Sequence, residues 1–300
     1  ATALALAKVL SSIDADFSKW RTKIASIFVI VVPMLLVFLQ NDTGSALVFA
    51  SFVFVLFREG LSAYVLVFGA ALIVLFVSAL LIDKYILVAI LFALCLVAWL
   101  VIKRKSHRTK VWLFLVCFLI SSAVVFAVDV VFDKGLEQHQ KDRIEVLLGK
   151  KEDLKGVGYN VNQSKIAIGS GGFLGKGFLN GTQTKYNFVP EQDTDFIFCT
   201  IGEEWGFIGS SITIILFLTL CIRLVKMAER QRSKFARIYG YGVASIIFFH
   251  FFVNIGMTIG LLPVIGIPLP FISYGGSSLW AFTLLLFIFI RQDASRLELI

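Results

Sequence analysis

Charged residues are scarce in this sequence, and their scarcity excludes an ordinary soluble domain. Asp, Glu, Lys and Arg make up 16% of the 300 residues, against 58% apolar residues and a mean hydropathy of +0.87. A soluble domain carries about 25% charged residues and does not need so many apolar ones to fill its core. The lipid bilayer is therefore the solvent expected for most of this chain.

Cysteine and proline are also rare. The four cysteines stand singly in or beside apolar runs, without the C-x-x-C spacing of a metal or redox pair: Cys95, Cys117, Cys199 and Cys221. We interpret them as packing residues. Three of the five prolines fall together between Leu261 and Ser278, where they predict a rigid, broken element at the membrane face.

Long apolar runs take the place of the missing charges. A helix needs about 20 apolar residues to cross about 30 Å of hydrocarbon, and eight windows approach or reach that length. They are Ile24 to Leu39, Ser45 to Phe57, Leu61 to Ile82, Tyr85 to Ile102, Val111 to Phe132, Phe207 to Val225, Ala236 to Leu262 and Leu279 to Ile290. We predict an all-α, polytopic transmembrane bundle of about eight spans plus a partial helix at the N-terminal end, forming one membrane domain over residues 1–300.

Basic residues cluster in alternate short loops, all on one side if every window crosses. These residues are Lys19, Arg21, Lys23, Arg58, Lys103, Arg104, Lys105, Arg108, Lys110, Arg223, Lys226, Arg230, Arg232, Lys234, Arg237, Arg291 and Arg296. This is the positive-inside pattern, so that side is predicted to be cytoplasmic, where the loops meet anionic membrane lipids. The net charge of +8 is therefore explained without nucleic acid as a partner.

One long segment, residues 133–206, interrupts the apolar windows and is predicted to be a large extracytoplasmic loop. Its nine basic and eleven acidic residues leave it without the concentrated positive surface that nucleic acid requires. Gly135 to Gly156 has the pattern of an amphipathic helix on the membrane surface. Ile168 to Phe188 is too rich in glycine to be helical throughout, so we expect turns whose backbone approaches a ligand closely.

Two stretches carry a resemblance to a known family. The segment Ala167 to Ser210 contains, in order, GSGG, G-x-G, GTQ, PE-x-x-TDFIF and GEE-x-G-x-x-G, and a second stretch is NIGMTIGLLPVIGIPLPFISYGGSS, Asn254 to Ser278. Together they resemble the SEDS family of bacterial cell-wall polymerases, with RodA, FtsW and SpoVE as members. The GTQ run and Lys176 resemble the RodA branch. About three spans of the family would precede Ala1, so the resemblance implies an N-terminally truncated chain.

The resemblance implies a peptidoglycan glycosyltransferase that acts in cell elongation and shape maintenance. It would transfer a glycan from an undecaprenyl-pyrophosphate-linked donor to a sugar hydroxyl of lipid II. A lipid II flippase is the alternative, but a carrier places its polar groups near the bilayer midplane, whereas the distinctive polar residues here gather at the outer surface. The implied partner is a class B penicillin-binding protein with transpeptidase activity, and the implied location is the bacterial plasma membrane.

Asp195 is the candidate catalytic base, because it matches the Asp of the family's TDF run. An acceptor hydroxyl loses a proton as it attacks, which requires a carboxylate at the reaction centre. Asp195 precedes an apolar run, where partial burial would raise its pKa. The structural alternative is an Asp that caps the helix beginning near Phe196, and both roles are compatible.

Two further carboxylates, Glu191 and Asp193, lie four and two residues before Asp195. They would either raise the pKa of Asp195 or hold a divalent cation, Mg²⁺ or Mn²⁺, near the pyrophosphate. A solvated acidic turn is the simpler interpretation. No other cofactor is expected.

The pyrophosphate leaving group needs positive charge or oriented backbone N–H groups, which the glycine-rich run and Lys176 would supply. The opposing interpretation is a glycine-rich hinge with lysines directed to water. The candidate substrate-binding residues are Gly171, Gly172, Lys176, Gln183, Glu191, Thr194, Ser273, Tyr274, Gly275, Gly276 and Ser277. His250 and Asn254, four residues apart on one helix face, are expected to form interhelical hydrogen bonds.

Overall fold

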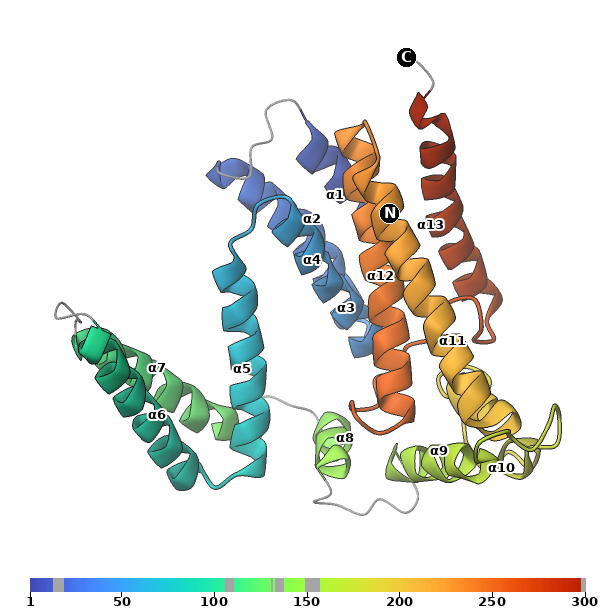
Figure 1. The fold of residues 1–300 in the computed structure, drawn as a ribbon, viewed down its shortest axis with the longest axis horizontal. Coiled ribbons are helices and arrows are strands. Elements are labelled where there is room, and N and C mark those ends of the chain that lie inside the picture. Colours follow the sequence, from blue (N-terminus) through green and yellow to red (C-terminus); the bar gives the residue numbers. More distant parts are fainter. Residues whose placement is uncertain (13–18, 106–110, 131, 133–137, 149–156, 298–300) are drawn as a thin grey trace. The chain divides into compact units, whose positions relative to one another are not determined.

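The computed structural model describes residues 1–12, 19–105, 111–130, 132, 138–148 and 157–297, and in these ranges it contains helices and no strand (Figure 1). The predicted all-α fold is confirmed. The chain divides into two compact units, one of residues 1–61 with 152–300 and the other of residues 62–151. The assignment of residues 1–300 to one domain stays a prediction.

The first unit contains most of the helices. They are α1 (Thr2–Ser11), α2 (Trp20–Phe38), α3 (Thr43–Val48), the 3₁₀ turn η1 (Phe49–Ser51), α4 (Phe52–Arg58), α9 (Val157–Gly171), α10 (Thr182–Lys185), α11 (Ile197–Glu229), α12 (Lys234–Thr258), α13 (Gly276–Ala294) and η3 (Ser295–Leu297). The second unit contains α5 (Ala63–Leu81), α6 (Lys84–Lys105), α7 (Val111–Val130) and α8 (Gln138–Leu147).

Helix α12 is the centre of the first unit. Its most apolar window is 67% buried, against 17% for α11, because α1, α4, α9, α11 and α13 all pack on it (Figure 1). Its small residues let these neighbours approach: a Cβ at Gly240 would lie 2.4 Å from the Phe289 ring of α13, and one at Gly242 would lie 3.3 Å from Ala3 of α1. Close packing of this kind drives helix association where lipid surrounds the bundle.

Ion pairs join the helices at the end of the first unit that is predicted to be cytoplasmic. Arg58, at the end of α4, donates to both carboxylate oxygens of Glu229 on α11 at 3.0 Å. Arg237 of α12 pairs with Glu59 at 3.2 Å, and Arg230 pairs with Asp293 in the last turn of α13. Several predicted cytoplasmic cations therefore hold helix ends together in addition to marking a membrane side.

The second unit is a thin assembly in which α7 packs against both α5 and α6. Its described helices expose many large apolar side chains, and only 6% of the best window of α5, and of α6, is buried. An apolar cavity of about 700 Å³ lies among the three helices. Helices that are apolar all round need either lipid or other protein as their surroundings.

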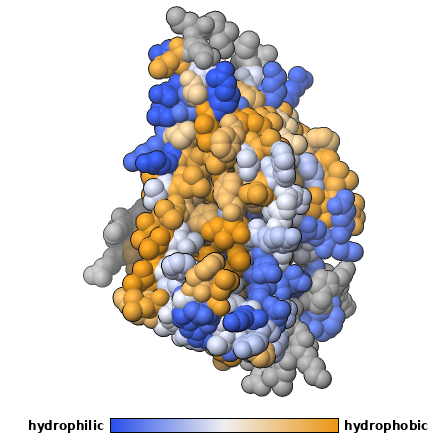
Figure 2. Space-filling model, turned by 90° about the vertical axis from the view of Figure 1, so that its right-hand side faces the viewer, coloured by the Kyte–Doolittle hydropathy of each residue, from blue (hydrophilic) through white to orange (hydrophobic). Residues whose placement is uncertain are grey.

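Five described helices are long and apolar enough to cross a membrane: α2, α5, α6, α11 and α12. Helix α1, the α3–α4 segment and the segment Phe114–Val128 of α7 are apolar but shorter. The face drawn in Figure 2 accordingly has a hydrophobic band between hydrophilic ends. These observations support a multi-pass membrane protein, while the count of eight spans and the sidedness of the loop stay predictions.

Three boundaries differ from the sequence-based expectation. The window Ser45 to Phe57 is not one helix, because η1 separates α3 from α4. Helix α11 begins at Ile197 rather than Phe207, and the predicted loop end at residue 206 coincides instead with a kink inside α11. Of the predicted surface helix, Gly135 to Gly156, the structure describes the part that forms α8; residues 133–137 and 149–156 lie outside the described residues.

We predict that Gly240→Ala destabilises the protein. The added Cβ meets the Phe289 ring, and over-packing of a close-packed core costs about 1–3 kcal/mol. Thermal unfolding of the purified protein in detergent measures the effect. Gly169→Ala is the matched control, because a Cβ at Gly169 has no atom within 4 Å. Equal stability of the two variants would contradict the close packing of α12 against α13.

Candidate active site

The kink in α11 lies at Gly206, whose backbone angles (φ 63°, ψ −156°) are not helical. In an uninterrupted helix the N–H groups of Phe207 and Ile208 would donate to the carbonyls of Glu203 and Glu204. The kink removes both bonds and leaves two donors and two acceptors unpaired. Such groups are costly at a membrane unless other parts of the protein satisfy them.

The glycine-rich loop after α9 satisfies all four groups. The freed carbonyls accept hydrogen bonds from the backbone N–H of Lys176 (3.0 Å) and of Gly177 (2.9 Å). The freed N–H groups donate to the carbonyls of Gly172 (2.9 Å) and Phe173 (3.3 Å). The loop thus replaces two helical hydrogen bonds with four of its own.

Glycine is required where this loop meets α11. A Cβ at Gly171 would lie 2.1 Å from the Gly202 carbonyl oxygen, and a Cβ at Gly175 (φ +82°) would lie 2.1 Å from the Glu204 carbonyl oxygen. The close backbone approach that we expected toward a ligand is made at these positions toward α11. Gly172, by contrast, has no atom within 4 Å of a Cβ position, so its surroundings remain open.

The Glu203 carboxylate lies under the same loop, with none of its side chain exposed. Lys176 Nζ donates to Oε1 at 2.7 Å, and the backbone N–H groups of Thr182 (2.8 Å) and Gln183 (2.9 Å) donate to the same oxygen. The N–H of Thr184 donates to Oε2 at 2.9 Å. Glu203 therefore receives the first N–H groups of α10, and a cation compensates its charge.

The position of Lys176 bears on its predicted contact with pyrophosphate. Its ammonium group bonds Glu203 and also Thr182 Oγ1, at 2.6 Å, so its charge is balanced inside the protein. It is not a lysine directed freely to water, which was the opposing interpretation. Binding of the pyrophosphate by Lys176 stays a prediction. Gln183 lies beside it, with its backbone held by Glu203 and its side chain half-buried.

Asp195 lies in a tight turn just before α11. The carbonyl of Glu191, a residue with φ +55°, accepts hydrogen bonds from the N–H groups of Asp195 and Phe196, both at 3.1 Å. Thr194 Oγ1 donates to the Glu191 side chain at 3.1 Å. The N-cap position of α11 is Phe196, without a side-chain cap bond, so Asp195 does not occupy that position.

The second signature stretch folds back onto this turn. Ser273 Oγ donates to the Thr194 carbonyl at 2.6 Å and accepts from the Leu269 N–H at 2.8 Å. The Tyr274 N–H donates to the Asp193 carbonyl at 2.8 Å. The structure therefore brings the two distant motifs together, while substrate binding by Ser273 and Tyr274 stays a prediction.

Asn254 of α12 links the two stretches through its side-chain amide. Its buried side-chain amide donates to the Asp195 carbonyl at 2.8 Å and to the Ile267 carbonyl at 2.7 Å. His250 Nδ1 lies 3.2 Å from the Pro268 carbonyl oxygen. Both residues form hydrogen bonds inside the protein, but the predicted interhelical pairing is wrong. The partners are loop carbonyls rather than side chains of a neighbouring helix.

The remaining candidate residues are mostly exposed. Gly275 is the N-cap of α13 (φ +154°), and Gly276 has open space around a Cβ position. Tyr274 and Ser277 are exposed, as is Glu191. The exposed groups around Asp195 are therefore contributed by both stretches.

The predicted divalent cation would have Glu191 and Asp193 as its carboxylate ligands. Within the described part of the chain, no three His, Cys, Asp or Glu side chains are grouped as ligands. Glu191 and Asp193 remain a solvent-exposed pair on one turn. The divalent cation stays a prediction, and no reaction step below is assigned to it.

Sequence reasoning missed Glu203 as a site residue. The GEE run was visible as a motif, and a carboxylate at the start of an apolar window was a signal that it needed buried partners. Its donors come from a loop some 20 residues away along the chain. On α11, Ile197 and Glu203 are six residues apart, about 9 Å of rise at about 1.5 Å per residue. The Glu203 network therefore lies in the first two turns of α11, close to the Asp195 turn that precedes the helix.

The part of the chain that carries these networks is similar to known proteins. A family model for cell cycle proteins of the FtsW, RodA and SpoVE type matches residues 86–297. The peptidoglycan glycosyltransferase MrdB of Escherichia coli is 47% identical over 144 residues, covering 48% of this chain and 39% of that protein. The peptidoglycan glycosyltransferase RodA of Treponema pallidum is 43% identical over 145 residues, covering 48% and 34%. The match therefore spans less than half the length of these relatives.

The fold itself is also known. A solved chain from a peptidoglycan synthase complex that coordinates polymerization and crosslinking superposes with a TM-score of 0.64 at 24% identity. The superposition covers 99% of this chain and 68% of that chain. At this level of identity, the likeness shows the shared helical fold.

We predict that Glu203→Gln strongly destabilises the protein and loosens the loop of residues 172–185. The change leaves the Lys176 ammonium without its counter-charge; loss of one partner of a fully buried pair costs about 3–5 kcal/mol, and the 26% exposure of the Lys176 side chain makes this an upper bound. Thermal unfolding and limited proteolysis of the loop measure the two effects. Glu191→Gln, at an exposed carboxylate, is the control and should change stability by less than about 0.5 kcal/mol. A Glu203→Gln protein as stable as the wild type would contradict the assigned role.

Proposed function

Because the chain belongs to the FtsW/RodA/SpoVE family of cell cycle proteins, with relatives in the RodA and MrdB branch, we propose that it is the catalytic membrane region of a peptidoglycan glycosyltransferase. The family resemblance read from the two motifs is thereby confirmed. The activity and the substrates of this protein belong to the proposal, because the chain matches only part of each relative. The proposed role is glycan synthesis in cell elongation and shape maintenance.

The proposed reaction moves one glycan chain between two lipid carriers. The acceptor is a sugar hydroxyl of lipid II, and Asp195 takes its proton. The hydroxyl oxygen then forms a bond to the anomeric carbon of the donor glycan. The bond from that carbon to the pyrophosphate oxygen breaks, and undecaprenyl pyrophosphate leaves with the bonding electrons. A well-placed general base accelerates such a transfer by about 10²–10⁴-fold.

The observation that carries the proposal is the fixed backbone of Asp195. Its N–H is bonded to Glu191, its carbonyl is bonded to Asn254, and its Oδ2 atom would lie 3.3 Å from a Cβ on Gly266. A base is effective only when it is held within hydrogen-bond reach of the proton it removes. The half-buried side chain between two loops provides such a fixed position.

Lateral access for a lipid substrate supports the same proposal. Helix α11 exposes large apolar side chains along its length, among them Ile212, Ile215 and Leu216, each more than half exposed. A polyprenyl chain is soluble only in surroundings of this kind. The sugar end of the lipid would then reach the polar loops at the start of α11 while the chain stays in the bilayer.

The arrangement favours a polymerase over a lipid II flippase. A carrier needs polar groups near the bilayer midplane, open alternately to both faces. Here the Asp195 and Glu203 networks gather where α11 begins, where α12 ends and where α13 begins, at one end of the first unit (Figure 1). No described feature favours the flippase specifically.

A class B penicillin-binding protein is the proposed partner, and the bacterial plasma membrane is the proposed location. Glycan strands require crosslinking as they form, and the structural neighbour comes from a complex that coordinates the two reactions. The five helices capable of crossing a membrane support an integral position in the bilayer.

We predict that Asp195→Asn lowers the rate of lipid II polymerisation by about 10²–10⁴-fold, because the amide cannot accept the proton. The full-length protein, purified with its partner, is incubated with lipid II, and glycan products are resolved on gels. Thermal unfolding verifies that the variant is folded.

Asp193→Asn is the matched control, since it removes the same charge two residues away and leaves the backbone bond to Tyr274 intact. It should polymerise at nearly the wild-type rate. An Asp195→Asn protein with undiminished turnover would contradict the assigned base. Equal losses in both variants would favour a shared cation instead. Lipid II translocation by the wild type without polymer formation would favour the flippase.

A further inference from the structure

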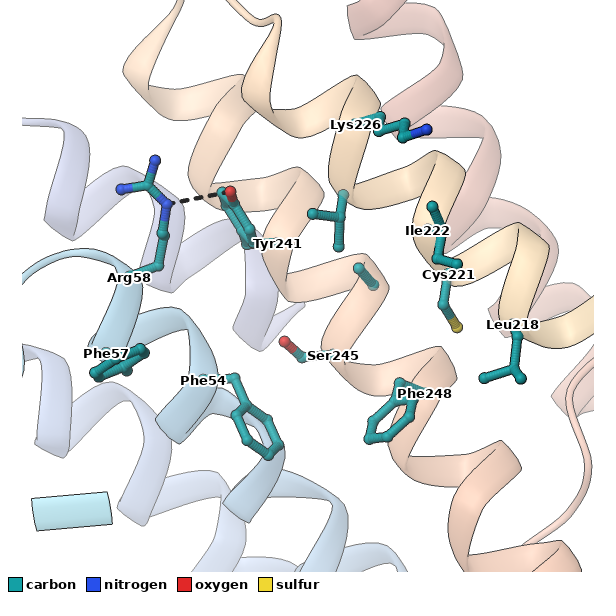
Figure 3. A pocket seen from close by; sticks show the side chains of 12 residues that line it. Phe54, Phe57, Arg58, Leu218, Cys221, Ile222, Lys226, Tyr241, Ser245 and Phe248 are labelled. Carbon is teal, nitrogen blue, oxygen red and sulfur yellow. Dashed lines mark hydrogen bonds between the residues drawn. The ribbon is translucent and has the colours of Figure 1, made fainter. Parts of the chain in front are cut away.

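An apolar pocket of about 560 Å³ lies at the other end of α11 and α12 from Asp195. Its sides are α4 and α11, and its floor is α12 (Figure 3). Phe54, Leu218 and Phe248 line one end, while Arg58, Tyr241 and Lys226 lie at the other. The size falls in the range of about 300–1,000 Å³ that small-molecule sites occupy.

The position of the pocket separates it from the proposed reaction. Ile208, just after the kink, and Lys226 are 18 residues apart on α11, a rise of about 27 Å at about 1.5 Å per residue. That distance is close to the roughly 30 Å thickness of the hydrocarbon core. The polar end of the pocket therefore belongs to the opposite membrane face, the one that the basic loops predict to be cytoplasmic.

The depth of the pocket matches one leaflet. Leu218 and Lys226 are eight residues apart, a rise of about 12 Å. One leaflet contributes about half of the hydrocarbon core, or about 15 Å. A fatty acyl chain of a lipid in that leaflet fits this depth, whereas a long polyprenyl chain would extend well beyond it.

The charges at the polar end of the pocket indicate which lipid headgroup it suits. Arg58 is neutralised by Glu229 and is held by the Tyr241 hydroxyl at 3.2 Å. Lys226 is exposed and has no carboxylate partner among the described residues. The pocket end thus carries one uncompensated cation. Basic pockets between helices on this membrane side suit anionic lipid headgroups.

We propose that this pocket binds an anionic phospholipid of the cytoplasmic leaflet. One acyl chain lies along α12 between Phe54, Leu218 and Phe248, and the phosphate pairs with Lys226. The lipid fills space between α4 and α11, which both pack on α12 but leave the pocket between them. This site is separate from the glycosyl transfer proposed above and does not depend on it.

Native mass spectrometry of the full-length protein tests the proposal. The detergent-purified protein is titrated with phosphatidylglycerol and, separately, with phosphatidylcholine of the same acyl chains. The wild type should bind one phosphatidylglycerol more tightly than phosphatidylcholine. Lys226→Gln should weaken phosphatidylglycerol binding by about fivefold, the factor that corresponds to about 1 kcal/mol per basic residue near the membrane surface.

Arg223→Gln is the matched charge control. Arg223 is exposed on the same helix, three residues from Lys226, but does not line the pocket. Its replacement should leave the affinity nearly unchanged. Equal losses in the two variants would indicate diffuse attraction rather than a site, and would overturn the proposal. So would a wild type that does not distinguish the two lipids.

A second pair of variants tests the apolar part. Ser245 points into the pocket from α12 (Figure 3), so Ser245→Phe should fill it and abolish tight binding of phosphatidylglycerol. Ser78→Phe, which fills the cavity among α5, α6 and α7, should leave that binding intact. Tight binding retained by a folded Ser245→Phe would overturn the proposal. If the Ser245→Phe variant does not fold, the phosphatidylglycerol affinity of Lys226→Gln, a change at an exposed residue, still tests the proposal.

Discussion

The buried carboxylate of Glu203 is the constraint on which the rest of the site depends. Removing a carboxylate from water costs several kcal/mol, and here Lys176 Nζ and three backbone N–H groups offset that cost. All four donors come from residues 176–184. One side chain on α11 therefore determines the course of a loop that has little regular structure of its own.

The kink at Gly206 also ties the loop to α11, here through backbone hydrogen bonds. A broken helix is stable near a membrane only where its freed groups find partners, and residues 172–177 provide them. Because the loop supplies the hydrogen bonds that the kinked helix lacks, α11 keeps its shape at Gly206 only with the loop in place. The turn with Asp195 begins that helix, so its position follows from the same packing.

Helices α11 and α12 connect two places with different chemistry. At one end, loop carbonyls and Asn254 fix the turn of Asp195. At the other end, ion pairs such as Arg58–Glu229 hold the helix ends around an apolar pocket. The close-packed interface at Gly240 lies next to Tyr241, at the pocket end of α12, and packs the central helix against Phe289 of α13. The packed pair α11 and α12 thus positions both sites, one at each end.

The sequence by itself determined the all-α class, most of the apolar helices and the two motif stretches, because hydrophobicity over 20 residues and motif order are local properties. It also singled out Asp195 as a candidate, although only through resemblance. Tertiary structure alone decided that Lys176 pairs with Glu203, that η1 divides the α3–α4 segment, and that Asn254 bonds the Asp195 carbonyl. These features depend on partners 27 to 59 residues away or on packing against neighbouring helices, and no local pattern encodes which distant group will satisfy a buried charge or a freed backbone bond.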